Sequence, residues 1–431
     1  MAGKKVKSTA DRGPTALHKY RGTGFEEFYA DPPMTPAEAQ EERENIYHPD
    51  LPFVERIETC IQRYRARRRL GTSDPIFSKY LFLGGIDSTP RMFGGHVDAD
   101  LQGMTPEEKR TATAVDTVHM SGGGSRFYND ADRAGCWDVD FAGVAAGFLS
   151  ENLPALAAWD YPQMGKAVGV LENFLAYVLH HDVCPEHDAD VKAALAVCQR
   201  AKVELPQTHQ ALLRFPGELN LALSELFCKD YYFFGEGEFQ RPANFAPENV
   251  VKVAFSTAGS QRQYEAVMEG LASKTIKVVC EEECSMQVIS VHRPSTELRD
   301  LVRSITLDEG GPFAPVGSMV AKPCLIEDGF DRGEHFGLPE EDEETFLLDD
   351  AILSRLEPGF KLQLCVCELN IGIKFIKHAR LVLVEWHTFL PQNLMLHFKE
   401  PVPNDRPPMS AAAPEVEGGP AKATEEVPTE S

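Results

Sequence analysis

The feature that most constrains the fold is a pair of apolar, strand-like segments near the C-terminal end, residues 360–369 and 371–386. The pattern is interrupted only around residues 370–372, and two such runs joined by a short break predict a β-hairpin. Far upstream, residues 164–180 carry apolar side chains at the spacing of an α-helix. The character of the chain changes after Tyr231. The sequence therefore predicts an α+β protein, with a helical N-terminal half, a mixed β-rich C-terminal half and disordered termini.

Local patterns place the other expected elements. Thr35, Pro36 and Glu38 are typical of a helix start, with threonine as N-cap and proline in the first turn. Asp138 and Asp140 alternate with apolar neighbours, which predicts the wet face of a short strand. Further helices are expected over residues 51–70, 188–202, 218–228, 261–271 and 296–305, strands over 250–255, 275–280, 286–291 and 320–325, and a loop over most of 308–345.

Composition divides the chain into six regions. Segments rich in glycine, proline or charge mark the boundaries, because such segments rarely build a packed core. The regions are a disordered basic N-terminus (1–24), a docking segment and basic helix (25–83), a Gly/Asp-rich linker region (84–135), a helical region (136–230), a mixed α/β region with the C-terminal β-hairpin (231–400) and a disordered tail (401–431).

Charge is distributed unevenly over the 431 residues, whose formal net charge is −23. Residues 1–70 carry a net charge of +2, so the remainder of the chain carries −25. An acidic body repels nucleic acid at long range and attracts basic partners. If this protein works beside RNA, we expect a basic partner protein to hold the RNA.

A cluster of arginines lies on the helix expected over residues 51–70. Five arginines within seven positions exceed what solubility requires, which favours a nuclear-import signal or a phosphate-contacting patch. The alternative is one solvated face of an amphipathic helix. Three lysines at the N-terminus could serve import equally well, and the expected location is the nucleus, with the cytoplasm as a further possibility. The residues are Arg63, Arg65, Arg67, Arg68, Arg69, Lys4, Lys5 and Lys7.

The cysteines and histidines do not form a recognised metal module. Cys198, Cys228, Cys365 and Cys367 lie in apolar runs, which is typical of small buried side chains in a reducing compartment. His181, Cys184 and His187 are the strongest metal candidate, but they lack a second ligand pair at the spacing of structural zinc sites. The alternative is a capping segment after a helix, and the sequence predicts neither a metal nor another cofactor.

Motifs of catalysis and of membrane insertion are missing from the sequence. There is no phosphate-binding glycine loop ending in Lys-Ser/Thr, no His-Glu-x-x-His and no Gly-x-Ser-x-Gly. The two aspartates at 138 and 140 could pair for acid–base work, but a strand explains them more simply. No run approaches about 18 apolar residues and no apolar signal segment follows the N-terminal lysines. We therefore expect a non-enzymatic protein without membrane contact.

Five segments together carry a family resemblance: TGFEEFYADPP (23–33), RIETCIQRYRARRR (56–69), VDFAGVAAGFL (139–149), HDVCPE (181–186) and LCVCEL (364–369). The chain resembles the Argonaute-binding subunit of the fungal Argonaute siRNA chaperone complex over about residues 20–400. This resemblance implies a partner Argonaute, a second chaperone subunit, and duplex siRNA held through Argonaute. It also implies restraint of slicing and passenger-strand release, and support of heterochromatin formation and histone methylation.

Two segments are candidates for partner contact. Phe25, Phe28 and Tyr29 form a short aromatic cluster before a proline pair, which is typical of an extended docking segment. The second is the densest acidic run, which could compete for the basic channel of an Argonaute, although a solvated linker explains it too. Its residues are Glu340, Glu341, Asp342, Glu343 and Glu344. Two other functions stay open: direct RNA binding through the arginine cluster, and an uncharacterised metal-dependent hydrolase.

Overall fold

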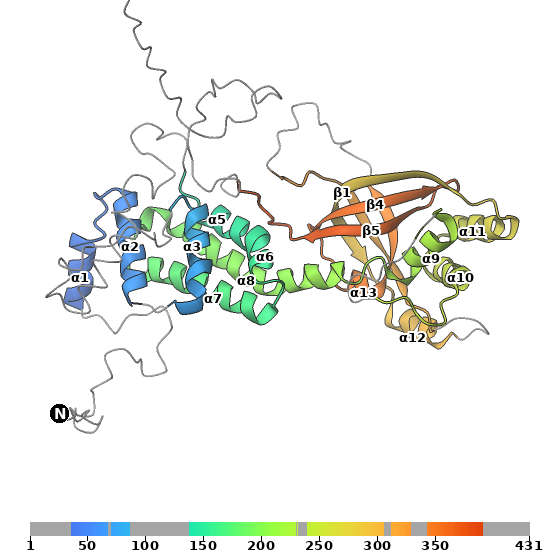
Figure 1. The fold of residues 1–431 in the computed structure, drawn as a ribbon, viewed down its shortest axis with the longest axis horizontal. Helices are drawn as coiled ribbons and strands as arrows, with labels where there is room; N and C mark the ends of the chain where they lie inside the picture. The colour runs from blue at the N-terminus through green and yellow to red at the C-terminus, as the bar shows by residue number, and fades with distance from the viewer. Residues whose placement is uncertain are drawn as a thin grey trace, which may run out of the picture. The chain divides into compact units, whose positions relative to one another are not determined.

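The computed structural model describes residues 36–67, 70–86, 138–229, 231, 239–305, 312–328 and 343–390 (Figure 1). In this part of the chain, the N-terminal half is helical and all strands lie between Val278 and Leu383. The predicted α+β class, with a helical N-terminal half and a β-rich C-terminal half, is therefore confirmed. Predictions made for residues 1–24, for the linker beyond Ile86 and for residues 401–431 lie outside the described residues.

The helical part is organised around helix α2 (Phe53–Arg67) and helix α7 (Tyr161–His180). Ile57, Ile61 and Tyr64 are buried, as their helical spacing predicts. The ring of Tyr64 packs edge-on against Phe174 and Tyr177 of α7, at centroid distances of 5.4 and 5.3 Å. The other elements here are α1 (Pro36–Asn45), a 3-10 turn (Gly71–Ser73), α3 (Asp74–Leu83), α5 (Phe141–Gly147), the π-helical turn η4 (Phe148–Asn152), α6 (Leu153–Leu156), a 3-10 turn (Pro185–His187) and α8 (Asp188–Leu212). None of the helices in the described ranges has the length and apolarity to cross a membrane.

The segment around Asp138 and Asp140 is not a strand, so that prediction was wrong. Asp140 is the N-cap of α5, and its Oδ1 accepts the backbone N–H of Gly143 at 2.6 Å. The carboxylate of Asp190 accepts the preceding N–H groups of the same helix, at residues 141 and 142. Because first-turn N–H groups have no intrahelical acceptor, carboxylates are favoured at this end of a helix. The alternation of acid and apolar residues reflects capping and not a strand face.

Helix α8 contributes to two hydrophobic cores. It continues beyond the expected end at residue 202 as far as Leu212, with Pro206 inside it. Leu205 belongs to the core of the helical part, and Ala211 belongs to the core beneath the sheet. A proline inside a helix removes one hydrogen bond, so the sequence predicts that the helix ends before Pro206. Burial on both cores stabilises the longer helix.

The sheet has five antiparallel strands in the order β3-β2-β1-β4-β5. The hairpin predicted over 360–369 and 371–386 is confirmed as β4 (Lys361–Leu369) and β5 (Lys374–Leu383). Gly372 has a φ of +73° in the connecting turn, a conformation that favours glycine. The other strands are β1 (Val278–His292), β2 (Val316–Pro323) and β3 (Glu344–Asp349).

Three strand predictions need correction. Residues 250–255 belong to helix α10 (Pro247–Ala258), whose Val251 and Phe255 are buried four positions apart, so the β-branched residues misled the prediction. The strands expected over 275–280 and 286–291 are one strand, because β1 pairs with β4 through the polar residues between them. Strand β3 begins inside the expected loop of 308–345 and pairs with β2.

Helices cover the sheet where its two edges come together (Figure 1). These are α9 (Gly217–Phe227), α10, α11 (Gln261–Ser273), α12 (Thr296–Ser304) and the single turn α13 (Asp350–Leu353); α9, α11 and α12 match predicted helices. The sheet curls so that edge strand β5 approaches edge strand β3. Asn220 of α9 bridges them: its Oδ1 accepts the N–H of Ile376 at 3.1 Å and its Nδ2 donates to the carbonyl of Leu347 at 3.5 Å. Helix α9 therefore supplies polar partners to both edges of the open sheet.

Candidate functional site between the edge strands

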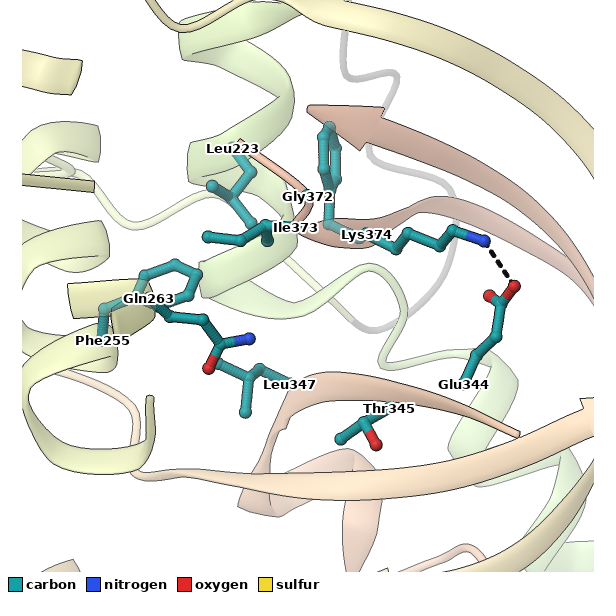
Figure 2. A pocket seen from close by; sticks show the side chains of 10 residues that line it. Leu223, Phe255, Gln263, Glu344, Thr345, Leu347, Gly372, Ile373 and Lys374 are labelled. Atoms are coloured by element: carbon teal, nitrogen blue, oxygen red, sulfur yellow. Dashed lines mark hydrogen bonds and ion pairs between the residues drawn. The ribbon is translucent and has the colours of Figure 1, made fainter. Parts of the chain in front are cut away.

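A pocket of about 170 Å³ lies where β3 and β5 approach each other. Figure 2 shows its side chains, which come from helices on one side and from the two edge strands on the other. Its lining residues are Leu223 of α9, Phe255 of α10, Gln263 of α11, Glu344, Thr345 and Leu347 of β3, and Gly372, Ile373, Lys374 and Phe375 at the start of β5.

The rim of this pocket carries one ion pair. The Nζ of Lys374 lies 2.5 Å from Oε1 of Glu344 (Figure 2), so the two edge strands are joined by charge as well as by Asn220. The hydrogen bond that Lys374 donates to Glu344 raises the pKa of Lys374, and the carboxylates of Glu368 and Glu282 act in the same direction. Lys374 is therefore positively charged and surrounded by carboxylates.

The floor of the pocket is apolar. The apolar side chains of Leu223, Phe255 and Ile373 point into the pocket (Figure 2). Thr345 on the exposed edge and the amide of Gln263 supply polar groups. An apolar floor with a few polar groups at the rim suits the side chain of a partner protein. Among the described lining residues there is no pair of groups arranged for nucleophilic or acid–base chemistry.

The acidic run predicted for partner contact meets this pocket at one end. Glu344 lines it and binds Lys374, and Glu343 precedes β3 as an exposed residue. Glu340, Glu341 and Asp342 lie outside the described residues, as do Phe25, Phe28 and Tyr29. Sequence reasoning did not find Lys374, Gln263 or Thr345. The only local signal was the break at residues 370–372, which marks the turn beside the pocket.

Two arginines of the predicted basic cluster are engaged within the fold. Arg63 binds Oε1 of Glu42 at 2.6 Å. Arg65 donates to Ser78 at 2.8 Å and lies 3.6 Å from the carboxylate of Asp74. Helix α2 therefore uses these two side chains to hold α1 and α3. The side chain of Arg67, together with Arg68, Arg69, Lys4, Lys5 and Lys7, lies outside the described residues.

The histidine-containing loop is tied to the first two helices. The Nδ1 of His181 lies 2.7 Å from Glu42, and the side chain of His181 is fully buried. Arg56, a buried residue that sequence reasoning did not single out, donates to the carbonyl of Val183 at 2.7 Å and forms a two-pronged pair with Glu186. These contacts connect the family segments at 56–69 and 181–186 to each other in space.

The three metal candidates do not converge. Burial raises the pKa of Cys184 to about 12, which disfavours the thiolate that a metal would need. His187 instead packs edge-on against Phe53, with a centroid distance of 5.1 Å. Across the described ranges, no group of three or more His, Cys, Asp or Glu side chains has an arrangement that could hold a metal ion.

Comparison with known proteins gives two matches. A family described as Argonaute siRNA chaperone (ARC) complex subunit Arb1 matches residues 15–401. Argonaute-binding protein 1 of Schizosaccharomyces pombe is 31% identical over 219 residues, which are 49% of this chain and 51% of that relative. The alignment thus spans about half the length of the curated relative. No solved structure matches the chain. Because the family match extends over most of the sequence, the chain belongs to the Arb1 family of Argonaute siRNA chaperone complex subunits.

Proposed function

We propose that this protein is a non-catalytic subunit that binds Argonaute. The observation that carries the proposal is the family match over residues 15–401, and the name of the yeast relative gives the partner. The pocket between β3 and β5 supports it, since a pocket with an apolar floor and a polar rim accepts an anchoring side chain and its lining residues offer no arrangement for catalysis. The net charge of −23 also favours a basic protein partner over direct contact with RNA.

We propose that the pocket is one contact for Argonaute. Thr345 is exposed on an edge strand, so a long side chain at this position can enter the pocket without disturbing the core. Its neighbours Phe346 and Leu348 point to the opposite face and are buried. A substitution at residue 345 therefore tests the pocket while leaving the sheet in place.

Replacing Thr345 by lysine is expected to weaken Argonaute binding at least tenfold, because the added chain fills the pocket and places a second ammonium near Lys374. The matched control is Thr345→Val, which keeps the β-branched shape and should bind as wild type. Binding is measured by titrating purified Argonaute with the full-length chain. Equal affinities for wild type and Thr345→Lys, with unchanged thermal unfolding, would remove the pocket from the interface.

A more detailed role is proposed from the family to which the chain belongs. We propose that the protein acts beside a second chaperone subunit, keeps duplex siRNA with Argonaute, restrains slicing and supports heterochromatin formation. The acidic run ending at Glu344 contributes by competing for a basic surface of Argonaute. Adding purified protein to a reconstituted slicing reaction should slow cleavage and passenger-strand release, and Thr345→Lys should relieve that effect in proportion to its loss of binding. An unaffected slicing rate at saturating protein would refute the proposed restraint.

We propose that nuclear location depends on basic residues other than Arg63 and Arg65. Arg63 and Arg65 bind within the fold, so a clean test omits them. Replacing Arg67, Arg68 and Arg69 by serine, together with the N-terminal lysines Lys4, Lys5 and Lys7, is expected to shift a fluorescent fusion toward the cytoplasm. An unchanged nuclear signal in the combined variant, expressed at wild-type level, would show that import uses another route.

A further inference from the structure

Two thiols from distant parts of the chain lie side by side on the sheet. Cys228 is the C-cap residue of α9, and Cys367 belongs to strand β4, between β1 and β5. Their Sγ atoms are 4.0 Å apart, although 139 positions separate them in the sequence. Cys228 is half-buried, whereas Cys367 is fully buried. The pair therefore joins a half-buried cysteine to a fully buried one.

Charged groups beside this pair provide a path for a proton. Oε2 of Glu281 lies 3.8 Å from Sγ of Cys367, and Oε1 of Glu281 lies 2.6 Å from Nζ of Lys377. The hydrogen bond from Lys377 lowers the pKa of Glu281, so this carboxylate is an acceptor at neutral pH. The hydrogen bond from Cys367 lowers the pKa of Cys228, with the charge of Lys377 acting in the same direction.

We propose that Cys228 and Cys367 are a peroxide-sensitive dithiol that closes to a reversible disulfide. The thiolate of Cys228 attacks one oxygen of hydrogen peroxide, the O–O bond breaks, and Cys228 becomes a sulfenic acid while hydroxide leaves. Cys367 then gives its proton to Glu281 and attacks the sulfur of Cys228, which breaks the S–O bond. Glu281 passes this proton to the departing hydroxide, which leaves as water, and the first hydroxide takes up the proton that Cys228 released on forming its thiolate. In total, two thiols are oxidised and one peroxide is reduced to two waters.

The neighbouring cysteines fit this chemistry less well. Cys365 lies two residues before Cys367 on the same strand, where the pleat holds successive same-face residues about 7 Å apart at Cα. Its thiol donates to Glu281 at 3.7 Å. Cys280 is exposed on β1, where it lies opposite Glu368 of β4 in the sheet register. Cys228 differs because it ends a helix, where a small backbone rotation can bring its sulfur into bonding distance.

Closure would fasten the C-terminal end of α9 to β4. Helix α9 also carries Asn220, which bridges the two edge strands, and Leu223, which lines the pocket. A covalent link across 139 positions restricts the unfolded chain, so the oxidised protein should unfold at a higher temperature than the reduced protein.

The test treats the full-length, reduced protein with hydrogen peroxide and then blocks the remaining thiols. We expect intact mass before blocking to fall by two hydrogen atoms, about 2 Da, and a non-reduced digest to contain the Cys228–Cys367 peptide pair. Dithiothreitol should restore the starting mass. Cys228→Ser should abolish the linked peptide, whereas Cys280→Ser should leave it unchanged.

A second variant distinguishes proton transfer to Glu281 from a purely structural role of this side chain. Glu281→Gln keeps the shape of the side chain but removes the acceptor, so it should slow disulfide closure and leave a longer-lived sulfenic acid, which dimedone traps on Cys228. The proposal fails if wild-type protein shows no linked peptide at peroxide concentrations that oxidise Cys280. It also fails if the linkage joins other cysteines.

Discussion

Replacing Asn220 by leucine is expected to lower the free energy of unfolding by about 3 kcal/mol. Asn220 is fully buried, and its amide contacts backbone groups of both edge strands. Leucine has nearly the same volume, so packing changes little, but the N–H of Ile376 and the carbonyl of Leu347 lose this partner inside the protein. Each unmet buried group costs about 1–3 kcal/mol. Equilibrium unfolding in urea measures the change.

A control variant distinguishes the bridge from any loss of a buried polar group. Thr208 of α8 is also buried, and its hydroxyl donates to the carbonyl of Leu205 in the same helix at 2.9 Å. Thr208→Val removes the donor and leaves no backbone N–H unmet, so its cost should stay below about 1 kcal/mol. Equal losses for Thr208→Val and Asn220→Leu would show that bridging the two edges adds nothing.

Asp349 is expected to contribute a loss of stability as pH rises from about 4 to about 7. This carboxyl group is buried, and burial raises its pKa from 3.8 to about 7, in spite of hydrogen bonds from the N–H groups of Glu218 and Leu219. In that pH window the folded state keeps a proton that the unfolded state releases, so each step up in pH favours unfolding. The shift corresponds to a loss of about 4 kcal/mol, complete near pH 7.

Asp349→Asn isolates this contribution. Asparagine keeps the shape and one acceptor oxygen but does not titrate, so the variant lacks the contribution of residue 349 to the pH dependence. Carboxylates with lowered pKa values, such as Glu186 and Glu281, work in the opposite direction in both proteins and cancel in the comparison. We expect the stability of the variant relative to wild type to rise by about 4 kcal/mol between pH 4 and pH 8. Parallel stability curves would contradict the buried-acid explanation.

Only single residues of the candidate site could be predicted from the sequence. Glu344 was singled out for its place in an acidic run, yet its partner Lys374 lies 30 positions away on another strand. The two meet because the sheet curls until its edges approach, a result of packing that no local pattern contains. The role of Arg56 could not be predicted either, because an arginine on an amphipathic helix is usually solvated. In the structure the loop before α8 buries it.

The sequence by itself determined the elements whose signal is local and periodic. The apolar stripe of α2, helix α11 and the hairpin of β4 and β5 follow from side-chain spacing and turn chemistry within one segment. Family membership was also readable, because the resemblance over about residues 20–400 agrees with the family match over residues 15–401. Tertiary structure decided that residues 250–255 are helical, since Val251 and Phe255 gain burial only against the sheet and its neighbouring helices. It also decided the pairing of Glu344 with Lys374 and of Cys228 with Cys367, because contacts between distant segments depend on how the elements pack, which side-chain periodicity does not encode.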